Sequence, residues 1–373
     1  MAHSHVDPDG LMEFSVVFTD RSLNHMSAVF QQVMRDISGM LKDVYKADHV
    51  AIVPGGGTYG MEAVARQFGA DAHALIVRNG WFSYRWTQIF DAGQFTAQTT
   101  VFKARQAGND TRAPFAPAPI EDVTQAIREA RPDVVFAPHV ETSAGIILPD
   151  DYITQLAAAA HEVGALMVLD CIASGCVWVD MAATGVDVLI SAPQKGWSAS
   201  PSAGLVMMSN RAKERLEATT SNSFAIDLKK WSSIMEAYEN GGHAYHATMP
   251  TDALRAFRDT MVETRDYGFD KLRDAQWELG NAVRDMLREK GIKSVAAEGY
   301  GAPGVVVSYT DDPDIQNGKK FAALGMQIAA GVPLQCDEPS DFRTFRLGLF
   351  GLDKLYDVAG TVARLRGVVD QVL

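Results

Sequence analysis

Between residues 49 and 209, short apolar runs alternate with longer amphipathic stretches, and this alternation constrains the fold more than any other feature. Short runs rich in Val, Ile and Leu predict buried strands, and the stretches between them predict helices. Strands and helices that alternate in this way form βαβ units, which build a mostly parallel sheet flanked by helices. The expected strands are 49–53, 74–77, 99–102, 134–137, 166–169, 188–190 and 204–208, and expected helices include 120–130 and 150–163.

The rhythm changes after residue 218. Residues 219–248 are polar and contain a Glu-Asn-Gly-Gly turn signal, and a long helical stretch follows at 251–290, with Gly268 and Gly280 as candidate breaks. The remainder predicts a small α+β unit with strands at 294–297, 304–309 and 344–349 and helices at 317–330 and 353–372. We therefore expect an N-terminal segment (1–24), a large domain (25–250) and a linking helix with a small C-terminal domain (251–373).

Charge and composition exclude several classes of partner. The chain has 46 acidic and 34 basic residues, a net charge of −12, which disfavours nucleic acid or an anionic membrane as a partner. No apolar run approaches the ~18 residues of a membrane span, and the polar start of the chain, with His3 and His5, does not resemble a signal peptide. The three cysteines, Cys171, Cys176 and Cys336, lack the spacing of zinc ligands. We expect a cytoplasmic protein without a metal site.

A lone lysine, Lys195, follows the apolar run 187–190 in a loop of small residues, Ser-Ala-Pro-Gln-Lys-Gly at 191–196. Packing does not account for a lysine there, but open α/β folds bind ligands at the carboxyl ends of their strands. Asp170 ends the preceding apolar run, 166–169. A lysine and an aspartate at neighbouring strand ends suit pyridoxal 5′-phosphate, because the lysine forms a Schiff base and the aspartate pairs with the ring nitrogen.

Three further segments carry residues that suit a ligand. Residues 54–58, Pro-Gly-Gly-Gly-Thr, join a strand to a helix, which is the geometry of a phosphate cradle or of a plain tight turn. Residues 79–85, Asn-Gly-Trp-Phe-Ser-Tyr-Arg, place aromatic side chains at a helix start, where they either stack on a planar ring or join the core. Residues 138–145 cluster polar side chains at a strand end, as site lining or as a loop network.

Taken together, these segments resemble the class V aminotransferases of pyridoxal-phosphate fold type I, in particular the alanine/serine–glyoxylate and 2-aminoethylphosphonate–pyruvate aminotransferases. The resemblance covers about residues 25–372. Its most specific parts are His-Val-Glu-Thr-Ser-Ala-Gly at 139–145, Asp-Cys-Ile-Ala-Ser at 170–174 and Ser-Ala-Pro-Gln-Lys at 191–195, in the order and spacing of the family. It implies an α/β fold with a mostly parallel central sheet and a smaller C-terminal α+β domain.

The resemblance also implies a role for individual residues at the cofactor. Lys195 would be the Schiff-base lysine and proton shuttle, and Asp170 would hold the ring nitrogen. The residues that would bind the phosphate are Gly56, Gly57, Thr58 and Gln194. Phe82 and Ile172 would cover the two faces of the ring, and Thr142 would contact its edge.

Substrate and subunit contacts follow from the same resemblance. Tyr245 and Thr248 would reach the phosphate of the neighbouring subunit, in a homodimer with shared active sites. Arg346 would bind the carboxylate of a small amino acid, whose amino group passes in two half-reactions to a small 2-oxo acid such as glyoxylate or pyruvate. The Pro-Gly-Pro loop usual in the family is absent at 16–26, where His25 is followed by Met26, so the substrate is left open.

Other activities on the same scaffold remain as alternatives. Arg346 suits a phosphonate as well as a carboxylate, as a 2-aminoethylphosphonate–pyruvate aminotransferase requires. A lyase or cysteine desulfurase is a rival, although Gln194 stands where a desulfurase has histidine, and Cys336 lies in a loop. A non-catalytic binding protein is disfavoured because Lys195 and Asp170 are both present.

Overall fold

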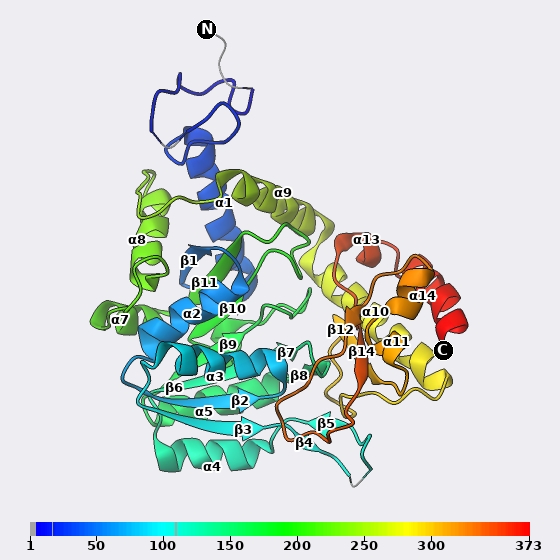
Figure 1. Ribbon diagram of the computed structural model, residues 1–373. Coiled ribbons are helices and arrows are strands. Elements are labelled where there is room, and N and C mark those ends of the chain that lie inside the picture. Colours follow the sequence, from blue (N-terminus) through cyan, green and yellow to red (C-terminus); the bar gives the residue numbers. More distant parts are fainter. Residues whose placement is uncertain (1–4, 17, 109) are drawn as a thin grey trace.

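The computed structural model describes residues 5–16, 18–108 and 110–373, so His3 and Val17 lie outside the described residues. A seven-stranded sheet in the order β1-β11-β10-β9-β6-β2-β3 forms its centre (Figure 1). All seven expected strands are present: β1 (His49–Pro54), β2 (His73–Arg78), β3 (Gln98–Lys103), β6 (Val134–Pro138), β9 (Leu166–Asp170), β10 (Val188–Ser191) and β11 (Ala203–Met208). Only β11 runs against its neighbours β1 and β10, which confirms the mostly parallel sheet.

Helices cover this sheet and bury its apolar strands. Helices α2 (Gly57–Phe68), α3 (Trp81–Gly93) and α5 (Asp150–Glu162) pack directly on it, and α4 (Ile120–Ala130) packs on α5. Trp86 of α3 lies 4.4 Å from Phe136 of β6 between ring centroids, and both side chains are completely buried. This contact anchors the helix whose first turn reaches the carboxyl edge of the sheet. The remaining helices of this part are α1 (Ala28–Tyr45), α6 (Met181–Thr184), α7 (Asn210–Ala218) and α8 (Leu228–Glu239).

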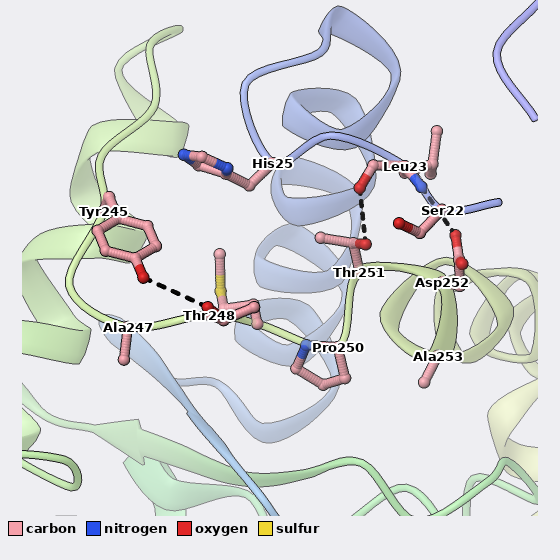
Figure 2. A pocket seen from close by; sticks show the side chains of 11 residues that line it. Ser22, Leu23, His25, Tyr245, Ala247, Thr248, Pro250, Thr251, Asp252 and Ala253 are labelled. Carbon is pink, nitrogen blue, oxygen red and sulfur yellow. Dashed lines mark hydrogen bonds between the residues drawn. The ribbon is translucent and has the colours of Figure 1, made fainter. Parts of the chain in front are cut away.

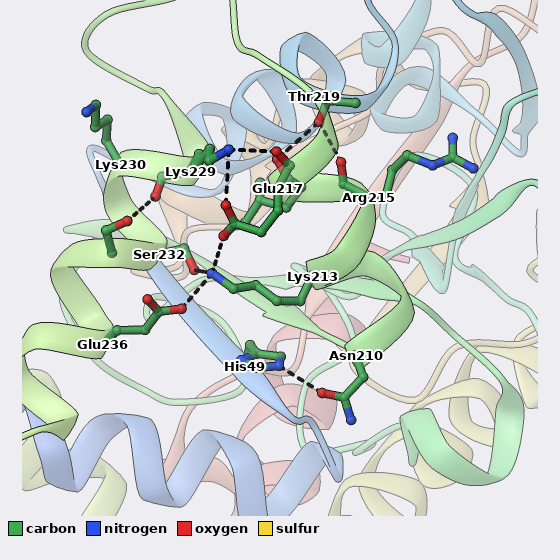
Figure 3. A network of polar contacts seen from close by, with 12 residues as sticks. His49, Asn210, Lys213, Arg215, Glu217, Thr219, Lys229, Lys230, Ser232 and Glu236 are labelled. Atoms are coloured by element: carbon green, nitrogen blue, oxygen red, sulfur yellow. Dashed lines mark hydrogen bonds and ion pairs between the residues drawn. The ribbon is translucent and has the colours of Figure 1, made fainter.

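Helix α8 lies within residues 219–248, where we recognised no helix. Its apolar side chains, among them Trp231 and Met235, are buried, but charged residues on its outer face dilute the pattern. Figure 3 shows how those charges join α7 and α8: Lys213 pairs with Glu217 and Glu236 at 2.8 and 2.5 Å, and Lys229 pairs with Glu217 at 3.0 Å. Pairing across two helices stabilises an element that its own periodicity did not reveal.

The C-terminal part is a smaller α+β unit on one side of the large sheet (Figure 1). The expected long helix is interrupted at Gly268, whose φ of 113° favours glycine, but not at Gly280. The two resulting helices are α9 (Thr251–Tyr267) and α10 (Phe269–Glu289), and a three-stranded antiparallel sheet in the order β12-β14-β13 packs near α10. Its strands are β12 (Val305–Tyr309), β13 (Ala329–Ala330) and β14 (Thr344–Gly348).

Several expectations for this unit are wrong. The helix expected at 317–330 is only α12 (Lys319–Ala323), because Gly325 adopts a φ of 78° and Ala329 and Ala330 pair with β14. Residues 294–297 form isolated bridges rather than a strand. The helix expected at 353–372 is divided into α13 (Leu352–Leu355) and α14 (Val358–Val372). A further short helix, α11 (Pro313–Gln316), follows β12.

Two ribbons connect the large sheet to the C-terminal unit. They are β4 (Arg105–Gln106) with β5 (Phe115–Ala116), and β7 (Val140–Glu141) with β8 (Ile146–Ile147).

The three domain boundaries drawn from the sequence stay a prediction. In the described part of the chain, no helix is both long and apolar enough to cross a membrane.

Candidate active site

A cavity of about 300 Å³ opens at the carboxyl ends of the parallel strands, and we call it the Lys195 pocket. Strands β9 and β10 are parallel neighbours with Asp170 opposite Ile190, so the aspartate and the loop that carries Lys195 meet at one edge. Nine of the twelve residues predicted to form the site line this pocket. They are Gly56, Gly57, Thr58, Phe82, Thr142, Asp170, Ile172, Gln194 and Lys195.

Asp170 is a buried carboxylate that needs a partner. It is 6% exposed, and Oδ1 accepts a hydrogen bond from the Ile172 amide at 2.9 Å. Burial raises the pKa of Asp170 to about 7, and the nearby Glu141 carboxylate acts in the same direction. A protonated ring nitrogen would supply the positive charge that this carboxylate lacks.

Lys195 lies half-buried across the same cavity. Burial lowers its pKa, and the positive charge of Arg346 lowers it further. Its Nζ lies 5.2 Å from the centroid of the Phe350 ring, and no carboxylate of the described residues lies within ion-pair distance. A lowered pKa increases the fraction of neutral amine, which is the form that attacks a carbonyl carbon.

The glycine loop leaves room at the start of α2. A Cβ on Gly57 would lie 2.5 Å from Cδ1 of Ile172, whereas a Cβ on Gly56 would meet no atom within 4 Å. The first amides of a helix have no intrahelical acceptor and attract anions. The described loop therefore fits a phosphate group.

Arg85, the last residue of the 79–85 segment, also lines the Lys195 pocket, although the sequence predicted no role for it. Its Nη1 donates to Oγ1 of Thr58 at 2.9 Å, from α3 to the first turn of α2. This contact places a permanent positive charge beside the glycine loop. Its position one turn after Phe82 was the available signal, because residues three apart on a helix share a face.

Glu141 is the second residue that sequence reasoning missed, although it lies in the most specific motif. It is completely buried and accepts hydrogen bonds from the amides of Phe82 and Ser83 at 3.1 and 2.9 Å. The hydroxyls of Ser83 and Ser143 each donate to it at 2.7 Å. The carboxylate thus caps α3 at the turn that carries Phe82, where negative charge is favourable.

Arg346 lies on β14, at the edge of the same region. Its Nε donates to the carbonyl of Ala330 at 2.8 Å, and its Cζ lies 5.6 Å from the centroid of the Phe82 ring. Burial lowers the pKa of this guanidinium, although the Glu141 carboxylate opposes that effect. Arg346 does not line the Lys195 pocket, but it approaches the pocket through Phe82.

Tyr245 and Thr248 do not join the other residues. They line a separate cavity of about 280 Å³, the Tyr245 pocket, which also contains Leu23, His25 and Asp252 (Figure 2). Tyr245 is 56% exposed, and its hydroxyl lies 3.3 Å from Oγ1 of Thr248. Their predicted contact with a neighbouring subunit stays a prediction.

Cys336 does not have the properties of a catalytic thiol. It is 5% exposed, its Sγ lies 3.4 Å from the carbonyl of Arg78, and burial raises its pKa to about 12. A nucleophilic cysteine requires an accessible thiolate. The geometry therefore disfavours a desulfurase. Among the described residues, no group of three or more His, Cys, Asp or Glu side chains is placed to hold a metal.

Curated proteins similar to this chain include aminotransferases and a hydrogenase subunit. Alanine–glyoxylate aminotransferase 1 of Saccharomyces cerevisiae is 25% identical over 330 residues, which cover 83% of this chain and 82% of that protein. A 2-aminoethylphosphonate–pyruvate transaminase of Burkholderia pseudomallei (strain 668) is 26% identical over 363 residues, or 94% of this chain and 92% of that one. The small subunit of a soluble hydrogenase from Synechococcus sp. (strain PCC 6716) is 24% identical over 353 residues, or 94% and 88%.

Solved structures show the same fold. The structure of an alanine–glyoxylate aminotransferase from Nostoc sp. superposes with a TM-score of 0.79 at 22% identity, over 94% of this chain and 89% of that one. Residues 13–303 match the family described as Aminotransferase class-V. The protein therefore belongs to the class-V aminotransferases, a family of enzymes.

Proposed function

We propose that the protein is a pyridoxal-phosphate-dependent aminotransferase that moves an amino group from a small amino acid to a small 2-oxo acid, glyoxylate or pyruvate. The observation that carries this proposal is the meeting of Lys195 and Asp170 in one pocket, at the ends of neighbouring parallel strands. The names of relatives such as alanine–glyoxylate aminotransferase 1 support the choice of substrates.

The chemistry follows from the charges that line the Lys195 pocket. Bound pyridoxal phosphate supplies a carbonyl for the substrate amine and a ring that takes up electrons. The carboxylate of Asp170 holds the positive charge of the ring nitrogen and so favours that uptake. Lys195, with its lowered pKa, accepts a proton at Nζ from the substrate carbon and returns it.

Other residues hold and orient the reactants. The amides at Gly56 and Gly57, the Thr58 hydroxyl and Arg85 suit a phosphate, while Phe82 and Ile172 enclose the ring position. Arg346 suits the substrate carboxylate, because a guanidinium binds a carboxylate through two parallel hydrogen bonds. A phosphonate satisfies the same donors, and the 26% identity to a 2-aminoethylphosphonate–pyruvate transaminase keeps that activity as the second candidate.

We further propose that the enzyme is a homodimer with shared active sites. Tyr245 and Thr248 are exposed and do not line the Lys195 pocket of their own chain. A neighbouring copy that inserted these hydroxyls into the Lys195 pocket would complete the phosphate site.

The cysteines Cys171, Cys176 and Cys336 are free, which suits the reducing cytoplasm that we propose as the compartment.

A donor screen tests the proposed function. The purified protein is loaded with pyridoxal phosphate, and alanine, serine, aspartate and 2-aminoethylphosphonate are added separately. We expect one small amino acid to bleach the cofactor absorbance, and glyoxylate or pyruvate to restore it. Bleaching by 2-aminoethylphosphonate alone would select the second candidate. Absence of bleaching by every donor, with the cofactor bound, would contradict an aminotransferase for these substrates.

A further inference from the structure

A third cavity, separate from the Lys195 pocket, has the properties of an anion site. It measures about 540 Å³ and lies between the loop that joins β4 to β5 and the C-terminal unit, where the end of α10 and β12 form its wall. We call it the Arg284 pocket. It shares no lining residue with the Lys195 pocket or the Tyr245 pocket. Its volume lies within the range of small-molecule sites, roughly 300–1,000 Å³.

Basic side chains outnumber acidic ones in the lining of the Arg284 pocket, in a protein whose net charge is −12. Four basic side chains line it, and one carboxylate, Asp110, does so. Lys293 pairs with Asp110 at 2.5 Å, while Arg288 pairs with Asp285 at 2.7 Å and Arg112 pairs with Asp311, both outside the lining. Three of the four cations therefore have a carboxylate partner.

Arg284 is the exception. Its guanidinium donates to the carbonyls of Gly280, at 3.4 Å, and Ala302, and no carboxylate of the described residues lies within ion-pair distance. Burial and the like charge of Arg288 lower its pKa to about 10, so it remains charged at neutral pH. A partly buried cation without a counter-charge is unfavourable, and a bound anion would remove that cost.

Apolar side chains form another part of the wall. Leu287 and Val306 are buried behind this part of the wall, whereas Ile292 and Pro114 are partly exposed and supply its accessible apolar surface. An inorganic ion would leave this surface uncovered. The complementary ligand is therefore an anion with an apolar body, such as an aryl or alkyl phosphate or carboxylate.

We propose that the Arg284 pocket binds a small organic anion, whose acidic group pairs with Arg284 and Arg288 and whose apolar part lies on Ile292 and Pro114. The pocket spans both units of the molecule. Phe115 of β5 donates its amide to the carbonyl of Val295 at 2.7 Å, and the Tyr309 hydroxyl donates to the carbonyl of Ala113 at 2.8 Å. A ligand there would contact the loop before β5 and helix α10 together.

Binding of 1-naphthyl phosphate to the protein loaded with pyridoxal phosphate tests this proposal. Isothermal titration calorimetry compares this ester with 1-naphthol, which lacks the charge, and with inorganic phosphate, which lacks the apolar body. We expect saturable binding of the ester, and affinities at least about ten-fold weaker for each fragment, because a charge-assisted contact or a buried ring contributes at least that factor.

Matched variants on α10 assign the binding to this pocket. Arg288 and Arg273 each form an ion pair with an aspartate three residues before it, at 2.7 and 2.9 Å, but only Arg288 lines the pocket. We expect Arg284→Met to weaken binding at least about ten-fold and Arg288→Gln about three-fold or more, while Arg273→Gln leaves it unchanged.

Three results would overturn the proposal. Equal affinities of the wild-type protein for 1-naphthol and for the ester would show that the charge contributes nothing to binding, which contradicts an anion site. Equal affinities of Arg288→Gln and Arg273→Gln would place the ester elsewhere, and this pair decides the question even where Arg284→Met does not fold. Absence of saturable binding of the ester to the wild-type protein would show that the pocket is not a site for such an anion. Aminotransferase activity enters none of these measurements, so the proposed function is judged separately.

Discussion

The Lys195 pocket and the Tyr245 pocket both contain predicted cofactor residues, but the two are built differently. The first lies where buried strands and two helix starts converge, and its Asp170 is only 6% exposed. The second lies between the loop before α9 and the segment around His25, and its Tyr245 is 56% exposed (Figure 2). One chain therefore encloses the first group of residues and leaves the second facing outward.

In the proposed homodimer, this difference would separate the residues that act within their own chain from those that act on the neighbouring copy. The buried Asp170 and half-buried Lys195 have altered pKa values because their own chain removes water from them. The Tyr245 hydroxyl lies 3.3 Å from Oγ1 of Thr248, in the same loop. We therefore expect the largest effects from changes in the Lys195 pocket, and effects that depend on association from changes in the Tyr245 pocket.

Lys195→Ala should have the largest effect. The variant should fold and retain pyridoxal phosphate through its other contacts, but show essentially no turnover, because no amine remains to move the proton. Borohydride treatment of the wild-type protein should attach the cofactor to the peptide that contains Lys195. Lys213→Ala, in the surface network of Figure 3, is the control and should retain turnover. Labelling of any other lysine would contradict the assignment.

Asp170→Asn should have the second largest effect. The amide keeps the size of the carboxylate but loses its charge. The activation barrier should therefore rise by several kcal/mol, so that kcat falls about 10²–10⁴-fold, with a smaller change in KM. Cofactor content, measured by absorbance, should stay near that of the wild type. Turnover near the wild-type rate at full cofactor content would exclude this role for Asp170.

Mixed dimers test the Tyr245 pocket. Tyr245→Ala should weaken cofactor binding by ~1.5–3 kcal/mol, the contribution of a charge-assisted hydrogen bond. Heterodimers with Lys195→Ala in one subunit and Tyr245→Ala in the other should regain one intact site, and about half of the wild-type activity per dimer. The measurement is turnover of affinity-purified heterodimers. Activity no higher than the mean of the two parent homodimers would contradict the shared active site.

Glu141→Gln should have a smaller effect within the Lys195 pocket. An amide offers one acceptor oxygen where the carboxylate offers two, so part of the contact with the Phe82 and Ser83 amides is lost. We expect cofactor affinity to fall about ten-fold, measured by fluorescence titration. Glu338→Gln is the matched control, because Glu338 also accepts from loop amides, those of Leu334, Gln335 and Cys336. Equal losses in both variants would mean that Glu141 has no specific role at Phe82.

The smallest effect concerns the pH dependence of stability without the cofactor. The pKa of Asp170 is raised from 3.8 to about 7, so between these pH values the folded state binds more protons than the unfolded state. Stability from this group is therefore present at low pH and lost as pH rises through about 7. Urea unfolding should show Asp170→Asn gaining stability relative to the wild type between pH 5 and pH 8. An unchanged difference would contradict the raised pKa.

Part of the site could be predicted from the sequence because its residues lie at the ends of recognisable elements. The runs before Asp170 and Lys195 are continuously apolar, which is a local property of the chain. The predicted helix at 317–330 failed for a local reason, the left-handed Gly325, and for a non-local one, since Ala329 and Ala330 pair with β14, some fifteen residues later in the sequence. Helix α8 was missed because the charged residues that pair with α7 interrupt the apolar periodicity of its sequence.

The sequence by itself determined the seven strands of the large sheet, the glycine loop, and the positions of Lys195 and Asp170 at strand ends. Only the tertiary structure decided which side chains meet across long stretches of chain. Glu141 caps a helix that starts sixty residues earlier, Arg85 reaches Thr58 on another helix, and Arg284 has no ion-pair partner among the carboxylates that the structure describes. The physical reason is that burial periodicity is encoded locally, whereas hydrogen-bond partners and cavities depend on how the finished elements pack.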